Sequence, residues 1–130
     1  MFAKVKVWMR IVEINMVANG STGKIMRSIV EVACSNGHDA LSFSPYMHTI
    51  KRLPMPECGK KHIYYGSCFE SAIHKVIGRF LGANGIGSYF ATKKLLKKLM
   101  ECEPDVIHLH NLHSFCFNLP VFFRYLKKNI

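Results

Sequence analysis

The chain has 130 residues, of which 49% are hydrophobic and 20% are charged, so its composition excludes wholesale disorder. This length is enough for one domain with a hydrophobic core and too short for two. The formal net charge of +10 favours an anionic partner, such as nucleotide phosphates, nucleic acid or an acidic membrane surface, but it serves solubility equally well.

The first elements in chain order are a strand, a turn and a helix. Residues 10–17 are rich in β-branched side chains and predict a short buried strand. The turn at residues 19–23 follows, with Ser21 or Thr22 as the N-cap of a helix that runs to about Ser35. The helix is indicated by apolar residues at helical spacing: Ile25, Ile29, Val32 and Ala33.

The next segments complete a β-α-β unit, which predicts a parallel sheet with a right-handed crossover. Asn36-Gly37 ends the helix through a left-handed C-cap, and residues 40–44 form the second strand. Residues 45–56 contain three prolines and are interpreted as a surface loop. Residues 62–65 are expected to form the third strand.

The second half of the chain is mostly helical in pattern. Residues 67–82 predict one helix, and residues 84–87 break it. Ser88 then caps a helix to about Cys102, with Phe90, Leu95, Leu96 and Leu99 inside and Lys93, Lys94, Lys97 and Lys98 outside. Pro104 ends that helix, and the last elements are a fourth strand at residues 105–110 and a helix at residues 119–128.

These elements predict an α/β fold, a Rossmann-like parallel sheet with helices on both faces. We interpret residues 1–130 as a single, partial domain, because the chain stops straight after a helix where a doubly wound fold would continue. Residues 1–8 can be an upstream extension, since the strand pattern reads well from Arg10. No apolar run reaches the about 20 residues that a membrane-spanning helix needs. Five scattered cysteines without a C-x-x-C pair favour a reducing compartment.

The glycine turn between the first strand and helix is the first candidate site. Backbone N–H groups at a helix N-terminus bind anions, and glycine lets a phosphate or sugar approach closely. The P-loop pattern is excluded, because Ala18 stands where its first glycine belongs and Ile25 where its hydroxyl belongs. The dinucleotide fingerprint is excluded as well, since only Gly20 and Gly23 are available. Taken alone, the turn is interpreted by default as a plain capped connection between strand and helix.

A histidine pattern at residues 105–113 is the second candidate site. His108 and His110 share one face of a strand, and His110 falls at its carboxyl end, the same edge of the sheet as the glycine turn. We interpret His108 as a core histidine bonded to backbone and His110 as functional, and leave His113 undecided. A metal site of these three histidines fits no standard zinc spacing and lacks a well-placed carboxylate, so none is predicted. Glu13 is read as a paired buried carboxylate or an outward-facing one, without a catalytic role.

The lysines at positions 93, 94, 97 and 98 are the third candidate feature. They can lie on an anionic membrane surface, but a solvated helix face is the more common reason for such a pattern.

Four segments together resemble family-four glycosyltransferases, above all bacterial enzymes of capsule, exopolysaccharide or colanic-acid-type synthesis. They are residues 10–15 (RIVEIN), 20–25 (GSTGKI), 85–88 (GIGS) with 91–94 (ATKK), and 104–111 (PDVIHLHN). The resemblance runs from about Met9 to the end of the chain. It implies the GT-B fold, in which two Rossmann-like domains face each other across a cleft, and this chain corresponds to the N-terminal, acceptor-side domain. On this resemblance, we expect the donor-binding domain with its acidic motif to lie outside this sequence.

The resemblance also implies an activity and its residues. A retaining enzyme of this kind moves a sugar from a nucleotide-sugar donor to a glycan or lipid-linked acceptor, usually without a metal or cofactor. The turn residues Gly20, Ser21, Thr22 and Gly23 would approach the donor diphosphate, and His110 would lie near the transferred sugar. Asn111 and His113 are candidates for the acceptor side. We expect a cytoplasmic protein, peripheral on the inner face of the membrane, that is inactive without its second domain.

Two other functions remain open. A free-standing α/β module that binds a phosphorylated ligand would use the same turn and would be a stable monomer. A lysine-rich nucleic-acid binder ranks last, because no recognised motif supports it and the aromatic residues sit mostly at core-like spacing. We therefore expect no nucleic-acid partner.

Overall fold

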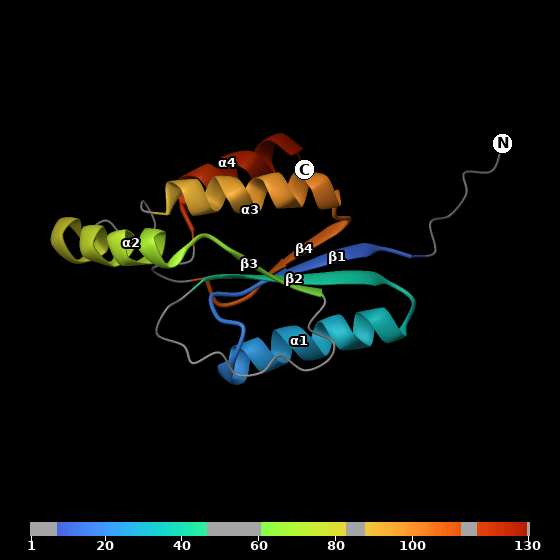
Figure 1. Cartoon of the computed structure of the whole chain (residues 1–130). Coiled ribbons are helices and arrows are strands. Elements are labelled where there is room, and N and C mark those ends of the chain that lie inside the picture. Colours follow the sequence, from blue (N-terminus) through green and yellow to red (C-terminus); the bar gives the residue numbers. More distant parts are fainter. Residues whose placement is uncertain (1–7, 47–60, 83–87, 113–116, 130) are drawn as a thin grey trace.

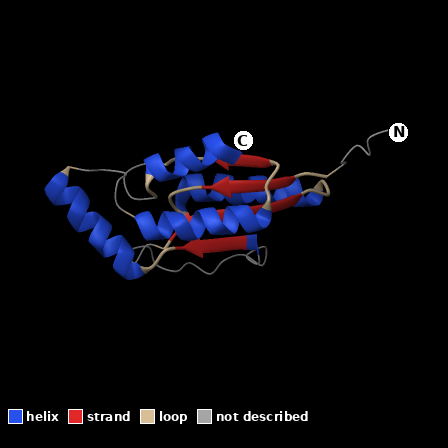
Figure 2. Ribbon diagram, turned by 90° about the horizontal axis from the view of Figure 1, so that it is seen from above, coloured by secondary structure: helices blue, strands red, loops and turns tan. Residues whose placement is uncertain are grey.

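Four parallel strands form one sheet in the computed structural model, which describes residues 8–46, 61–82, 88–112 and 117–129 (Figure 1). Their order is β3-β2-β1-β4, and the arrows of Figure 2 all point the same way. The strands are β1 (Arg10–Ile14), β2 (Asp39–Pro45), β3 (His62–Tyr65) and β4 (Val106–Leu109). The predicted fold class, an α/β parallel sheet, is confirmed.

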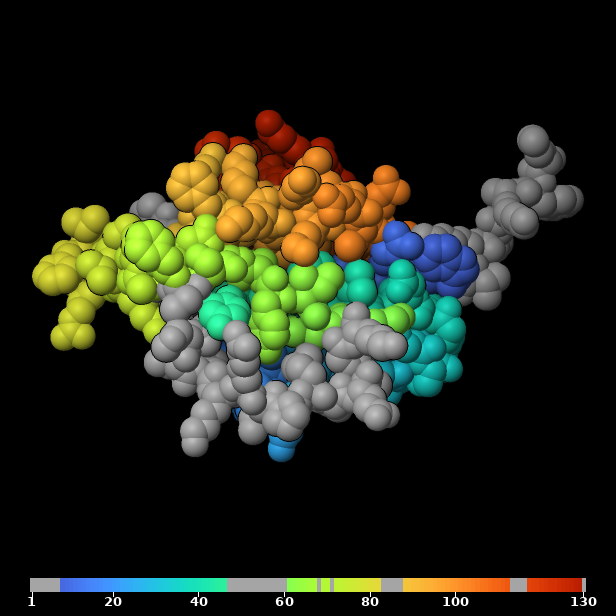
Figure 3. Space-filling model, viewed as in Figure 1, coloured from blue at the N-terminus to red at the C-terminus, as the bar shows by residue number. Residues whose placement is uncertain are grey.

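Helices cover both faces of this sheet, as predicted. Helix α1 (Gly20–Ser35) lies on one face, and α3 (Tyr89–Cys102) and α4 (Leu119–Asn129) lie on the other (Figure 1). Helix α2 (Cys68–Leu81) begins directly after β3, beside the start of α3, and its far end projects from one end of the molecule (Figure 3).

Several predicted boundaries change in the structure. Strand β1 ends at Ile14 and not at residue 17, and β4 is one residue shorter at each end than predicted. Helix α1 begins at Gly20, so its N-cap residue is Asn19, and the prediction of Ser21 or Thr22 is wrong. The parts of the predictions that concern residues 1–7, 47–56 and 84–87 lie outside the described residues.

The end of α1 follows the predicted chemistry, and α2 is capped at both ends. The Ser67 hydroxyl accepts a hydrogen bond from the Glu70 N–H (3.2 Å), and Gly82 closes α2 with a φ of 60°. Gly37 has a φ of 82° after α1. Its N–H bonds the Cys34 carbonyl, and the next N–H, at His38, bonds the Ala33 carbonyl, both at 3.0 Å. This pair of bonds is a Schellman motif.

The buried face of α1 differs from the predicted one. Gly23, Met26, Val30 and Ala33 are buried. Ile25 and Val32 are exposed, so of the four residues that indicated the helix only Ala33 is buried. Both sets have helical spacing, and the spacing alone therefore identifies the helix without fixing which stripe meets the sheet.

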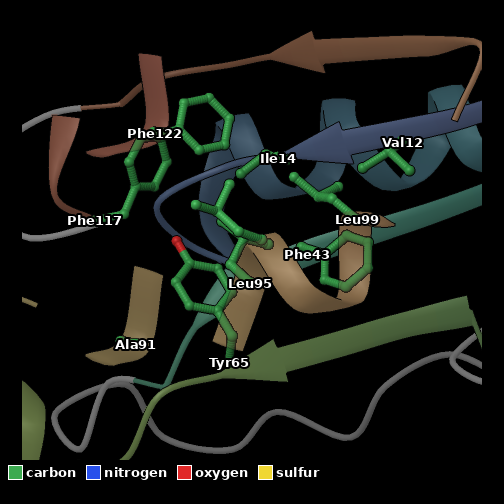
Figure 4. Packing of buried hydrophobic residues seen from close by; sticks show 10 residues of the cluster. Val12, Ile14, Phe43, Tyr65, Ala91, Leu95, Leu99, Phe117 and Phe122 are labelled. Carbon is green, nitrogen blue, oxygen red and sulfur yellow. The ribbon is translucent and has the colours of Figure 1, made fainter. Parts of the chain in front are cut away.

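The main core lies between the sheet and helices α3 and α4 (Figure 4). Leu95, Leu96 and Leu99 are buried there, as predicted for α3. Phe90 was expected inside but is 70% exposed, because the buried stripe of α3 begins at Ala91. The rest of the cluster comes from Ala91 of α3, from Phe117 just before α4, and from the sheet and α4, which contribute Val12, Ile14, Phe43, Tyr65 and Phe122.

The other face of the sheet is polar over much of its width. Register places Glu13 of β1 beside Ser42 of β2 and His108 of β4, and Ser42 beside His62 of β3. Side chains alternate along a strand, so these four residues share the face that α1 covers, because Ala40, two positions before Ser42, packs on α1. The sheet thus has one apolar face and one face that carries titratable groups.

A polar cluster joins the strands at the edge of the sheet where their amino ends lie. The Arg10 side chain donates to the Asp39 carboxylate (2.9 Å) and to the Cys102 carbonyl (2.6 Å), and the Arg10 N–H donates to Asp105 (2.6 Å). Lys61 also donates to Asp39 (3.3 Å). Partial burial alone would raise the pKa of Asp39, but the bonds from Arg10 and Lys61 outweigh it and lower the pKa.

Candidate functional site

The carboxyl ends of β1 and β4 meet at one edge of the sheet. The two strands pair in parallel up to Ile14 and Leu109. Beyond them, the His110 N–H donates to the Ile14 carbonyl (2.8 Å) and the Met16 N–H donates to the Asn111 carbonyl (3.4 Å). The glycine turn after β1 and the histidine pattern of β4 are therefore brought to the same edge, as the sequence predicted.

Buried Asn15 organises the turn between β1 and α1. Its side-chain amide donates to the Val17 carbonyl (3.0 Å) and to the Thr22 hydroxyl (3.2 Å), and its side-chain oxygen accepts from the Met16 N–H (2.9 Å). These bonds fold the chain back so that α1 starts close to the end of β1. Gly20, with a φ of 80°, makes the last bend.

The four candidate residues of the turn have different surroundings. Gly20 and Ser21 are exposed at the N-terminus of α1, where backbone N–H groups can meet an anion. Thr22 is half-buried and its hydroxyl is bonded to Asn15. Gly23 is buried against the preceding loop, and a Cβ there would come within 2.5 Å of the Ala18 carbonyl carbon and oxygen. Close packing therefore accounts for a glycine at position 23 without any ligand.

Glu13 contacts two histidines, His108 of β4 and His110 just after that strand. Its carboxylate is 1% exposed, and one oxygen, Oε2, contacts His108 Nδ1 at 2.9 Å and also His110 Nε2. The two imidazole rings are tilted against each other with their centroids 4.2 Å apart. The side chain of His110 is 10% exposed and that of His108 is 49% exposed. The three groups form a cluster with a buried carboxylate and an open side at His108.

This cluster settles the two sequence-based readings of Glu13 and corrects the one of His108. Glu13 is the paired buried carboxylate. His108 was expected in the core with a backbone partner, but it is half exposed and contacts a carboxylate, because β4 has a neighbour on only one side among the described strands. No carboxylate beside the histidines could be identified from the sequence, and Glu13 is such a carboxylate. Prediction of the Glu13 contact requires the β1–β4 register, which the sequence pattern does not supply.

The two candidate acceptor residues lie beyond His110. Asn111 is exposed, and its backbone carbonyl bonds the turn after β1. His113 lies outside the described residues.

A further histidine, which the sequence analysis did not single out, lies on the same face of the sheet. His62 Nδ1 is 2.8 Å from the Ser42 hydroxyl and Nε2 is 2.9 Å from the Ser44 hydroxyl. Burial, helped by the positive charge of Arg27, lowers the pKa of His62 to about 4. The alternation of Ser42 and Ser44 in β2 is the one sequence signal for a polar face there.

The lysine face of α3 is largely exposed, as predicted. Lys93, Lys94 and Lys97 are exposed and Lys98 is half-buried. Lys94 lies 3.5 Å from Glu70 of α2, and Lys97 lies 4.0 Å from Glu101. Such exposed pairs are worth about 0–1 kcal/mol and leave the lysines available. A groove of about 420 Å³ runs between α3 and α4, and its basic residues are Lys93, Lys97, Arg124 and Lys128.

Comparison with protein-family models gives no match to this chain, and no curated protein or solved structure matches it either. Among the described residues, no helix is both long enough and apolar enough to cross a membrane.

Proposed function

We propose that the chain is the N-terminal, acceptor-side part of a retaining GT-B glycosyltransferase of surface-polysaccharide synthesis. The enzyme would move a sugar from a nucleotide-sugar to a glycan or lipid-linked acceptor. The observation that carries the proposal is the pairing of β1 with β4, because it brings the glycine turn and His110 to one edge of a parallel sheet. Ligands of open α/β sheets bind outside the carboxyl ends of the strands.

Each residue at this edge has a role in the proposal. The exposed start of α1 at Gly20 and Ser21 offers backbone N–H groups to the donor diphosphate, whose negative charge grows as it leaves. His110 hydrogen-bonds the transferred sugar or accepts a proton. Asn111 is the candidate contact to the acceptor, together with His113, which lies outside the described residues. The nucleotide-sugar is a substrate, and no cofactor is required.

In this proposal the enzyme is cytoplasmic and binds peripherally to the inner face of the membrane. A lipid-linked acceptor resides there, and the basic groove between α3 and α4 suits an anionic lipid surface. Sedimentation with anionic vesicles is the test. Binding must fall when charge is reversed at Lys93 and Lys97, and it must be absent with neutral vesicles.

The activity is tested on the whole enzyme. The DNA that follows the coding segment is searched, in frame and after a frameshift, for a second Rossmann-like domain. The joined protein is then assayed with nucleotide-sugar donors beside the chain alone. We expect transfer only from the joined protein. His110→Ala should lower its kcat by about 10²–10⁴-fold, the usual contribution of a general acid or base. His38→Ala is the matched control, because His38 lies just before β2, at the opposite edge of the sheet. Transfer by the chain alone contradicts the proposal.

A second candidate is a free-standing module that binds a phosphorylated ligand. It is favoured by one observation, that the turn, its buried Asn15 and the exposed start of α1 all lie within this chain. Calorimetric titration with UDP, GDP and their sugar conjugates separates the two candidates. No binding fits a glycosyltransferase half without its donor domain. Micromolar binding by the chain alone favours the module.

A further inference from the structure

We infer that Glu13, His108 and His110 form a binding site for one divalent transition-metal ion, with Zn²⁺ as the best fit. The potential ligand atoms are Glu13 Oε2, His108 Nδ1 and His110 Nε2, and all three lie within 4.8 Å of one another. This site goes beyond the proposed glycosyl transfer and does not rest on it, but both use His110. With an ion on Nε2, His110 can meet the sugar only as a hydrogen-bond donor through Nδ1–H.

The backbone fixes these three side chains in place before any ion arrives. Glu13 and His108 are register partners on β1 and β4, and His110 is two residues further on the same face. Tetrahedral bonds of about 2.1 Å put ligand atoms about 3.4 Å apart. The three ligand atoms lie within 4.8 Å of one another, a range that includes this spacing. Glu13 Oε2 contacts both imidazoles closely, at 2.9 Å in the case of His108 Nδ1, so its side chain must move back slightly to admit an ion.

The donor set matches zinc better than magnesium or calcium. Two imidazoles and one carboxylate are the protein ligands of many open zinc sites, in which water or a substrate takes the fourth position. Magnesium and calcium prefer oxygen ligands throughout. His108 is half exposed and gives the ion a route from solvent.

Burial of Glu13 adds a second argument. A carboxylate that is 1% exposed has lost nearly all its hydration, and this is costly unless hydrogen bonds, here from the two imidazoles, and positive charge compensate it. A bound divalent cation supplies that charge directly. It also joins β1 to β4, whose residues are far apart in the sequence, so binding must stabilise the folded chain.

The experiment uses the purified chain after treatment with a chelator. Zn²⁺ is titrated against a chromogenic chelator, Co²⁺ is titrated by visible absorption, and thermal unfolding is followed with and without Zn²⁺. We expect one ion per chain, the d–d bands of tetrahedral Co²⁺ without a thiolate charge-transfer band, and a higher Tm with Zn²⁺. A thiolate band would show that cysteines hold the ion and would overturn the inference.

Three variants locate the site. His108→Ala is the decisive one, since a half-exposed side chain can be removed without unfolding the chain. It should weaken Zn²⁺ binding by more than the roughly 10–100-fold that the loss of an outer-shell partner costs. Glu13→Gln and His110→Gln should do the same, with circular dichroism as the check of folding. His38→Ala is the control and should bind like the parent chain. Binding that is absent, or unchanged in His108→Ala, overturns the inference.

Discussion

Gly20 and Gly23 belong to one turn but are glycines for different reasons. Gly20 has a φ of 80° and open space around it, so only its backbone conformation restricts the residue type. Gly23 has helical geometry, but it packs so closely on the Ala18 backbone that a methyl group has no room. A backbone contact cannot yield as the end of a flexible side chain can.

Alanine at these two positions should therefore act differently. Gly20→Ala should cost about 1 kcal/mol, the strain of a left-handed backbone. Gly23→Ala should cost about 3 kcal/mol through overpacking, although alanine inside a helix normally gains about 1 kcal/mol over glycine. Urea unfolding followed by circular dichroism measures both variants. A Gly23→Ala variant as stable as the parent chain would show that α1 can move away from the turn.

His62 makes the stability of the chain depend on pH. Its pKa is about 4 in the folded chain, mainly through burial, against 6.5 in the unfolded chain. Between these values the unfolded ring binds a proton that the folded ring does not, so stability is full above pH 6.5 and is lost as the pH falls towards 4. Each pKa unit corresponds to about 1.4 kcal/mol, and the partial exposure of the ring reduces the total to roughly 2 kcal/mol.

The prediction is checked by urea unfolding at pH 7 and pH 4.5 with a chelator present. The parent chain should lose roughly 2 kcal/mol more than His62→Gln between these two pH values. Equal losses would mean that His62 is protonated in the folded chain at pH 4.5.

At the residue scale, the sequence predicted which side chains share a face better than it predicted their partners. The alternation of strand residues put His108 and His110 on one face, and both reach Glu13. Glu13 itself lies 97 residues before His110, and no local pattern joins the two. The contacts of His62 with Ser42 and Ser44 were missed for the same reason, because they require the β2–β3 register.

Helix α2 has little apolar packing and relies on its ends and on the buried side chain of His74, which contacts Ser88. Phe69, Phe80 and Leu81 are at least 73% exposed, so the helix buries little apolar surface. Its first turn depends on the Ser67 hydroxyl, which accepts from the Glu70 N–H. An element of this kind opens by itself, at less cost than the unfolding of the whole chain.

Loss of the Ser67 cap should therefore loosen α2 alone. Ser67→Ala removes about 1 kcal/mol of helix stability, which raises amide hydrogen exchange in α2 about fivefold. Exchange in α3 and the sheet should stay unchanged. Ser28→Ala, at an exposed position inside α1, is the matched control and should leave α2 as it is. Exchange that rises equally everywhere would show that α2 unfolds only with the whole chain.

At the element scale, turn chemistry and spacing predicted every helix and strand of the described residues, but not which side of α1 is buried. Ile25 and Val32 are larger than the glycine and alanine on the opposite stripe and are nevertheless exposed. The small residues of that stripe let α1 approach the turn after β1 and the sheet closely, as the tight packing of Gly23 shows. Hydrophobicity alone gives no information on this need for a close approach.

One large core lies between the sheet and helices α3 and α4, so a cavity in it should lower the free energy of unfolding of the whole chain. Leu99 of α3 is fully buried in the core that this helix forms with the sheet. Leu99→Ala should cost about 2–5 kcal/mol, while Met100→Ala, at a position 59% exposed, should cost less than about 1 kcal/mol. Chemical unfolding measures both. Similar losses for the two variants would mean that α3 does not seal this core.

The central position of β1 has a consequence for synthesis on the ribosome. Of the described strands, β1 is the first to leave the ribosome, yet one of its two neighbours is β4. The hydrogen bond from the Arg10 N–H to Asp105 joins residues that are 95 positions apart. At about 5–20 residues per second, the nascent strand waits about 5–20 s with that edge unpaired. An inward-pointing charge is a common protection of unpaired edges. Until β4 emerges, Glu13 would provide that protection and discourage β1 from pairing with neighbouring nascent chains.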